Sequence, residues 1–127
     1  MPTPDGAAVR TPEVQVLSPK EYKSGTKPVW CPGCGDFGVL SATTKALAQL
    51  QLLPKDMVVV SGIGCSGRSP YFLSTYGFHG VHGRAIPVAT GVKLSNPALT
   101  VLVMAGDGDL MASGAGHVPH AAARTVD

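Results

Sequence analysis

Three cysteines are the residues best able to do chemistry, and they occur in two short glycine-rich stretches. Cys31 and Cys34 form the motif C-P-G-C, and Cys65 lies inside the stretch GIGCSG at 62–67. In a reducing compartment, clustered cysteines more often bind metal or catalyse a reaction than form disulfides. Three thiolates are one fewer than a four-thiolate site requires. A ligand of another type, or a further segment, must therefore complete the set.

The glycine-rich stretch at 62–67 lies in a region that favours an anionic ligand. Residues 57–106 contain no aspartate or glutamate. GIGCSG satisfies the dinucleotide motif G-x-G-x-x-G, but that motif also needs an acidic residue about 20 positions later to hold the ribose. We therefore disfavour a dinucleotide and keep two interpretations, an anion site and a glycine-rich turn with solvated cations. The basic or potentially basic side chains of the region are Arg68, His79, His82, Arg84 and Lys93.

Two aspartates follow the second apolar run, in the stretch AGDGD at 105–109. Ligands of open α/β sheets bind in the crevice beyond the carboxyl ends of the strands. Asp107 and Asp109 offer the hard oxygen ligands that magnesium takes together with phosphate oxygens, and Gly106 and Gly108 allow close backbone approach. Asp-Gly turns are common, so the motif alone is also compatible with an ordinary turn.

The sequence leaves several interpretations of the cysteines open. A thioredoxin-type dithiol would follow a strand, whereas the residues before C-P-G-C are rich in proline. His79 or His82 could complete a zinc site. An iron–sulfur cubane uses four cysteine thiolates, and an electron-transfer cluster makes better sense than structural zinc beside an anion site. A small buried thiol is the plainest interpretation of Cys65.

The predicted elements alternate in a way that places these motifs at the ends of strands. Apolar spacing predicts a helix over 36–50, and β-branched runs predict buried strands over 57–64 and 100–106. This order indicates an α/β fold with a parallel sheet flanked by helices. Two strands make a poor sheet, so we expect further strands. The other expected helices begin at Ser69 and Pro70, run from Pro87 to about Leu94, and occupy 112–124 with a kink or delay at Pro119.

Composition limits the classes of protein to consider. The 127 residues are 44% hydrophobic and only 14% charged, where about a quarter charged is usual for a soluble domain, so we expect a large subunit interface. A net charge of +2 gives no indication of nucleic acid binding. No apolar run reaches the roughly 18 residues of a membrane helix, and no signal peptide is visible, so we expect a cytoplasmic protein. We expect residues 1–27 to form an extended proline-rich arm.

Four blocks give the chain a strong resemblance to a known family. The blocks are WCPGCGDFGVL, SGIGCSGR, FHGVHGRAIPVATGVKLSNP and MAGDGDLMASGAGH. In order and spacing they resemble the beta subunits of 2-oxoacid:ferredoxin oxidoreductases, which use thiamine diphosphate and act on pyruvate, 2-oxoglutarate and related acids. The resemblance covers residues 28–127. It implies the N-terminal portion of a thiamine diphosphate-binding domain, incomplete at its C-terminal end.

The resemblance also implies roles for individual residues. Cys31, Cys34 and Cys65 would be three ligands of a [4Fe-4S] cluster, and Asp107 would be the first ligand of Mg²⁺. Arg68 stands where the family often has a lysine that meets the substrate carboxylate, a contact that arginine can make bidentately. The residues implied to lie near the cofactor are Gly64, Cys65, Ser66, His82, Gly106, Asp107, Gly108 and Asp109.

The implied reaction is oxidative decarboxylation of a 2-oxoacid to an acyl-CoA, with electrons passing through the cluster to ferredoxin. The implied partner is the alpha subunit, which in the family supplies the glutamate that activates the cofactor; this chain has no glutamate after Glu21. The family's second magnesium ligand and fourth cluster cysteine lie beyond the point where this sequence stops, so we interpret the chain as an N-terminal part. A zinc-binding module and an inert truncated chain are the alternatives. Neither nucleic acid nor a membrane is an expected partner.

Overall fold

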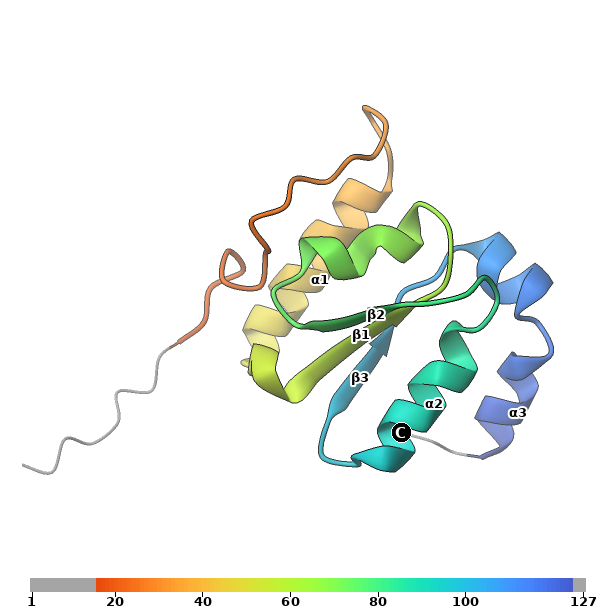
Figure 1. The fold of residues 1–127 in the computed structure, drawn as a ribbon. Coiled ribbons are helices and arrows are strands. Elements are labelled where there is room, and N and C mark those ends of the chain that lie inside the picture. The colour runs from red at the N-terminus through yellow and green to blue at the C-terminus, as the bar shows by residue number, and fades with distance from the viewer. Residues whose placement is uncertain (1–15, 125–127) are drawn as a thin grey trace, which may run out of the picture.

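The computed structural model describes residues 16–124, which form a three-stranded parallel sheet flanked by helices (Figure 1). The predicted α/β class is therefore confirmed. Within the described range, no helix is both long enough and apolar enough to cross a membrane. The helices are α1 (Asp36–Leu50), α2 (Ala85–Ser95) and α3 (His117–Ala123), with shorter helical turns η1 (Pro54–Asp56), η2 (Ser66–Phe72) and η3 (Gly108–Ser113); the strands are β1 (Met57–Ser61), β2 (Tyr76–His79) and β3 (Thr100–Val103).

The sheet has the order β2-β1-β3, and both neighbours run parallel to the central strand. Ser61 at the end of β1 is paired with His79 at the end of β2, and Val60 is paired with Val103 at the end of β3. Because parallel strands end at the same edge of a sheet, the turns that follow all three strands lie side by side. That carboxyl edge receives the two motifs GIGCSG and AGDGD.

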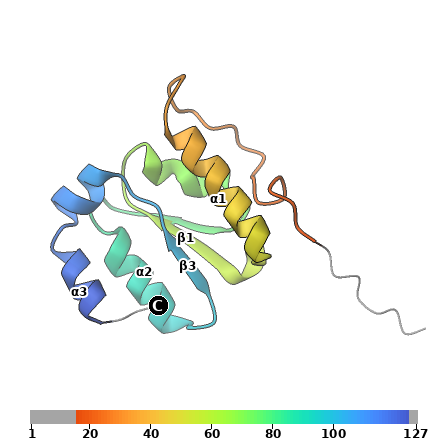
Figure 2. The same ribbon diagram turned by 180° about the vertical axis from the view of Figure 1, so that it is seen from behind.

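Helices cover both faces of the sheet. Helix α1 and turn η2 lie over one face, and helices α2 and α3 lie over the other (Figures 1 and 2). Leu40 of α1, Val59 of β1 and Phe72 of η2 share one buried cluster with Trp30. The opposite face buries Ala85 and Ala89 of α2. The small side chains of α2 allow that helix to pack closely against the sheet.

Helix α1 forms where the apolar spacing predicts it. Leu40, Thr44 and Leu47 recur every three or four residues and are the buried positions of the helix. Gln51 ends the helix in a left-handed conformation with φ 51°, and its backbone N–H caps the last carbonyls. Leu47 then packs with Tyr22 and Met57 in a second buried cluster.

Three features of the fold differ from the expectations. Strand β2 was not expected, because its sequence YGFH is short, contains glycine and is mostly exposed. Turn η2 begins at Ser66 rather than at Ser69. The last helical region is divided into η3 and α3, and Pro119 lies in the first turn of α3, where a missing N–H breaks no helical hydrogen bond.

The described part of the N-terminal segment is attached to the domain. Tyr22 is fully buried, and its hydroxyl donates to the Leu52 carbonyl at 2.8 Å. Lys23 forms an isolated antiparallel bridge with Leu73. The pKa of Tyr22 is raised above its usual value, first because burial disfavours the phenolate and second because Glu21 is negatively charged. The expected arm lies partly outside the described residues, and its extent stays a prediction.

Candidate active site

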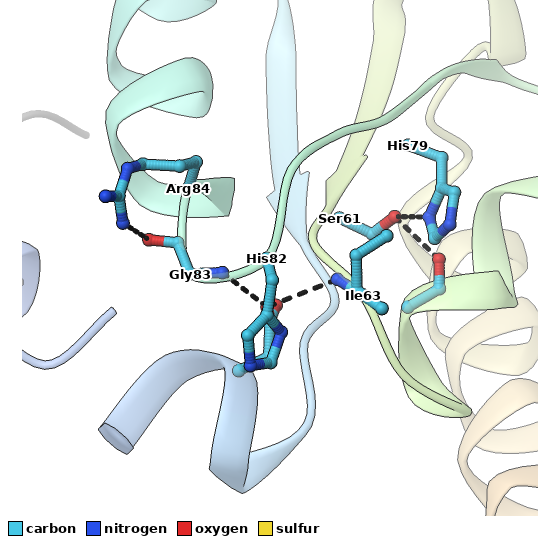
Figure 3. Close-up of polar contacts among 8 residues, drawn as sticks. Ser61, Ile63, His79, His82, Gly83 and Arg84 are labelled. Carbon is cyan, nitrogen blue, oxygen red and sulfur yellow. Dashed lines mark hydrogen bonds and ion pairs between the residues drawn. The ribbon is translucent and has the colours of Figure 1, made fainter. Parts of the chain in front are cut away.

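Asp109 joins the three turns at the carboxyl edge of the sheet. Its side chain is buried, and its Oδ1 atom accepts hydrogen bonds from the backbone N–H of Gly83 at 2.6 Å and of Ile63 at 3.2 Å. The same oxygen lies 2.8 Å from Nδ1 of His82, and Figure 3 shows the bonds from Gly83 and Ile63 meeting beside the His82 ring. One carboxylate from the turn after β3 therefore holds the turns after β1 and β2.

The other oxygen of Asp109 is enclosed without a partner. Oδ2 is buried and makes no hydrogen bond within the described residues. It occupies the space where a side chain at position 62 would begin, so that a Cβ atom added to Gly62 would collide with it. The first glycine of GIGCSG is thus required by Asp109 and not by a ligand.

Asp107, two residues earlier, has the opposite environment. Its side chain is exposed, and its carboxylate makes no hydrogen bond within residues 16–124. Cβ atoms added to Gly106 or Gly108 would meet nothing within 4 Å. The carboxylate is therefore free, and the backbone on each side is open to a bulky ligand. This donor and this open space fit Mg²⁺ with a bound diphosphate.

The turn after β1 is also open toward a ligand. Gly64 has a positive φ of 132°, which a residue with a side chain rarely adopts, and a Cβ there would again meet nothing within 4 Å. Cys65 is exposed, and Ser66 begins η2. Arg68 is exposed on the same turn, and no hydrogen bond from its guanidinium occurs among the described residues.

Two hydrogen bonds connect the two cysteine-bearing segments. The indole Nε1–H of Trp30 donates to the Cys65 carbonyl at 2.7 Å. Across the same junction, the Ser66 hydroxyl donates to Asp36 Oδ1 at 2.7 Å, and Asp36 Oδ2 lies 3.6 Å from Cys34 Sγ. The segment that carries C-P-G-C is therefore held beside the turn that carries the third cysteine.

Aromatic packing fixes Trp30 in this position. The ring is 8% exposed and makes edge-to-face contacts with Phe37, at 5.3 Å between centroids, and with Phe72, at 4.9 Å. The bridging roles of Trp30 and Asp36 were not predicted from the sequence. Their positions on either side of C-P-G-C were the only indication in the sequence. Their hydrogen-bond partners, the Cys65 carbonyl and the Ser66 hydroxyl, can be identified only from the fold.

The three cysteines do not converge on one point as the ligands of a single metal ion would. All three are free thiols; Cys31 and Cys65 are exposed and Cys34 is half-buried. Over residues 16–124, no three histidine, cysteine, aspartate or glutamate side chains are grouped so that they could hold one metal ion. The predicted zinc set is thus not gathered. A cubane binds each thiolate at a different iron, so its ligands surround the cluster instead of converging on one point. Exposed free thiols on two connected segments fit that group.

Comparison with known proteins agrees with this geometry. Residues 62–127 match the family model described as thiamine pyrophosphate enzyme, C-terminal TPP binding domain. The chain is 56% identical over 97 residues to "2-oxoacid:ferredoxin oxidoreductase 2, subunit beta" of Aeropyrum pernix, covering 76% of this chain and 31% of that protein. It is 45% identical over 108 residues to "2-oxoglutarate oxidoreductase subunit KorB" of Mycobacterium tuberculosis, covering 85% of this chain and 29% of that protein.

A solved structure has the same fold. It is a 2-oxoglutarate:ferredoxin oxidoreductase from Magnetococcus marinus with 2-oxoglutarate, coenzyme A and succinyl-CoA bound. The TM-score is 0.87 at 46% identity, and the match covers 90% of this chain and 39% of that one. The present chain spans about a third of the length of the curated relatives it matches.

Proposed function

Because the chain belongs to the thiamine pyrophosphate enzymes, among the beta subunits of 2-oxoacid:ferredoxin oxidoreductases, we propose that it contributes to oxidative decarboxylation of a 2-oxoacid. The substrate would be 2-oxoglutarate or pyruvate, the product an acyl-CoA, and the electron acceptor ferredoxin. The observation that carries this proposal is the free carboxylate of Asp107 between two open glycines, on the edge where the strands end.

Asp107 holds Mg²⁺ in this proposal, and Gly106 and Gly108 leave room for the diphosphate beside it. When bound, thiamine diphosphate supplies the electron sink that decarboxylation of a 2-oxoacid requires. Asp109 contributes indirectly, because it holds the turns that carry Gly64 and His82 around the same edge. Cys65 and Ser66 complete the set of residues that we place near the cofactor.

Cys31, Cys34 and Cys65 provide three ligands of a [4Fe-4S] cluster in this proposal, and the fourth comes from outside this chain. The two hydrogen bonds that connect the cysteine segments support it, because they fix the thiols relative to one another. Cys65 also neighbours Gly64 and Ser66, so the cluster would lie beside the cofactor. A cluster held there would supply an electron acceptor beside the cofactor, and ferredoxin would be the final acceptor.

Arg68 is our candidate for binding the substrate carboxylate. Its exposed guanidinium is available, and a planar guanidinium can hold a carboxylate through two parallel hydrogen bonds. The glutamate that activates the cofactor would come from the alpha subunit. An active site shared between two chains also agrees with the low charged fraction of 14%.

Binding of thiamine diphosphate by the assembled enzyme tests the cofactor site. Isothermal titration with and without Mg²⁺ should show magnesium-dependent binding that Asp107→Ala weakens at least about 100-fold, because a charged metal ligand is lost. Asp56→Ala is the matched control, since Asp56 is also exposed but precedes β1, at the opposite edge of the sheet. Wild-type affinity in Asp107→Ala would overturn the magnesium assignment.

Metal analysis of anaerobically purified enzyme tests the cluster site separately. We expect iron and acid-labile sulfide in the wild type, and their loss from this site in Cys31→Ala. Stoichiometric zinc in a colourless protein would instead support the zinc-binding module. Unchanged iron content and unchanged ferredoxin reduction in Cys31→Ala would contradict the cluster assignment.

A further inference from the structure

Two histidines at the carboxyl edge use the same ring nitrogen in contacts with the protein. His79 ends β2, and His82 follows three residues later. Nδ1 of His79 lies 2.8 Å from the Ser61 hydroxyl, and Nδ1 of His82 lies 2.8 Å from Asp109 Oδ1 (Figure 3). Neither ring makes a hydrogen bond through Nε2 within the described chain.

The partners of Ser61 decide which nitrogen of His79 carries hydrogen. Ser61 is fully buried, and its hydroxyl has a single hydrogen, which it donates to the Gly67 carbonyl at 2.6 Å. A carbonyl can only accept, so that hydrogen is committed. The contact between Ser61 Oγ and His79 Nδ1 must then be a hydrogen bond donated by the ring. His79 therefore carries hydrogen on Nδ1.

The surroundings of Asp109 decide the same question for His82. Its Oδ1 atom already accepts two backbone N–H groups, from Ile63 and Gly83. An oxygen that accepts these two bonds is not the protonated oxygen of a carboxylic acid, so it accepts from His82 as well. His82 therefore also carries hydrogen on Nδ1.

Other contacts hold the rings while leaving Nε2 available. The ring of Tyr71 lies 5.4 Å from that of His79 at an interplanar angle of 59°, and a Cβ at Gly67 would lie 3.6 Å from Cε1 of the same ring. His79 is half-buried, and the His82 side chain is 49% exposed. Both rings are fixed by their Nδ1 side and accessible at the carboxyl edge.

We propose that Ser61 and Asp109 are positioning residues that hold His79 and His82 with hydrogen on Nδ1, so that both present Nε2 as a hydrogen-bond acceptor. A neutral imidazole of this form accepts from an amino, hydroxyl or thiol group of a ligand. In this form Nε2 offers a lone pair, so each ring would pair with a donor group of a ligand. The inference rests only on contacts within the chain and would stand if the thiamine diphosphate proposal failed.

Nitrogen-15 NMR of the histidine rings tests the proposal directly. The protein would be labelled with ¹⁵N-histidine and studied at about pH 8, where an ordinary histidine is neutral. Two-bond ¹H–¹⁵N correlations distinguish protonated from unprotonated ring nitrogens. We expect His79 and His82 to show an unprotonated Nε2, whereas His117 and His120 should show the Nε2–H form that dominates free histidine in water. An Nε2–H form at His79 or His82 would overturn the proposal for that residue.

Substitutions can show whether Ser61 sets the tautomer of His79 or only contributes to the stability of the fold. Ser61→Ala should convert His79 to the Nε2–H form and leave His82 unchanged. Ser69→Ala is the matched control, because Ser69 is also buried and donates to a backbone carbonyl, that of Ser66, but does not contact a histidine. An unchanged His79 in folded Ser61→Ala would show that Ser61 does not set its tautomer. If Asp109→Ala, the matching test at His82, does not fold, the wild-type spectrum still decides the proposal for that residue.

Discussion

The turns around Asp109 and the two cysteine-bearing segments are joined by contacts of different kinds. Around Asp109, one buried carboxylate oxygen accepts three hydrogen bonds from two other turns. Between the cysteine segments, Trp30 and Asp36 make one hydrogen bond each, and none of the three cysteines is in a disulfide. In the first region a buried side chain holds three turns together. In the second, two hydrogen bonds hold the cysteine segments side by side without involving the thiols. Loss of one side chain should therefore cost more stability in the first region than in the second.

Asp109→Ala should have the largest effect on stability. The substitution removes the acceptor of the Gly83 and Ile63 N–H groups and of the His82 ring. The Gly83 N–H is buried, and leaving a buried group unsatisfied costs about 1–3 kcal/mol, whereas the other two lie at partly exposed positions. Because the enclosed Oδ2 is removed as well, we expect a net loss of about 3 kcal/mol in the free energy of unfolding. Urea denaturation measures it. Asp107→Ala is the control and should change stability by less than about 0.5 kcal/mol, because its side chain is exposed. Equal losses in both variants would contradict the contrast between the two aspartates.

Gly62→Ala should have the next largest effect, about 2 kcal/mol, because its Cβ collides with Asp109 Oδ2 and the turn must shift. Denaturation of the single variants and of the double variant with Asp109→Ala measures the coupling. The double variant should lose less than the sum of the single losses, since the colliding atom is gone. Gly91→Ala, in helix α2 with open space around it, should instead be neutral or slightly stabilising. Additive losses would show that Gly62 is not restricted by Asp109.

Trp30→Phe tests the connection between the cysteine segments. The variant keeps an aromatic ring against Phe37 and Phe72 but loses the hydrogen bond to the Cys65 carbonyl, which should cost about 1.5 kcal/mol. In the assembled enzyme the same variant should lose iron faster on exposure to a chelator, as followed by absorbance. Val29→Ala is the control on the neighbouring residue, whose side chain is 64% exposed. Iron release at the wild-type rate would indicate that the bond does not hold the cluster ligands.

Tyr22→Phe should have the smallest effect, about 1 kcal/mol at neutral pH, through loss of the hydrogen bond to Leu52. Its sharper signature is pH dependence. The pKa of Tyr22 is raised from 10.0 by burial and by Glu21, so the unfolded chain loses the phenolic proton first as the pH increases. The contribution of Tyr22 is therefore full below pH 10.0 and decreases above it, up to the folded-state pKa. Unfolding free energies measured across this range should decrease less steeply in Tyr22→Phe, and identical slopes would contradict the prediction.

Sequence patterns predicted more of the fold than of the site. Apolar spacing predicted α1, in which Leu40, Thr44 and Leu47 are buried, and β-branched runs predicted β1 and β3. Strand β1 is buried as expected, whereas β3 lies at the edge of the sheet and its residues are half-buried or exposed. Strand β2 escaped prediction because an exposed edge strand such as YGFH needs no apolar pattern. In the site, the glycines and the acidic pair predicted close backbone approach and two oxygen ligands, Asp107 and Asp109, without distinguishing them. Nothing in the sequence indicated that Asp109 is buried, because an irregular turn has no periodicity from which the exposure of its side chains can be predicted.

Residue type and order alone determined the α/β class, the cysteine set and the presence of two aspartates after a strand. Those features depend on chemistry that a side chain carries with it, or on contacts between neighbours in the chain. Only the tertiary structure decided which aspartate is free, which glycine is required by packing, and which nitrogens of His79 and His82 carry hydrogen. These outcomes depend on contacts between residues that are far apart along the chain, such as the close approach of Asp109 to Gly62 and its hydrogen bond with Ile63. Such partners meet only once the strands are aligned in the sheet.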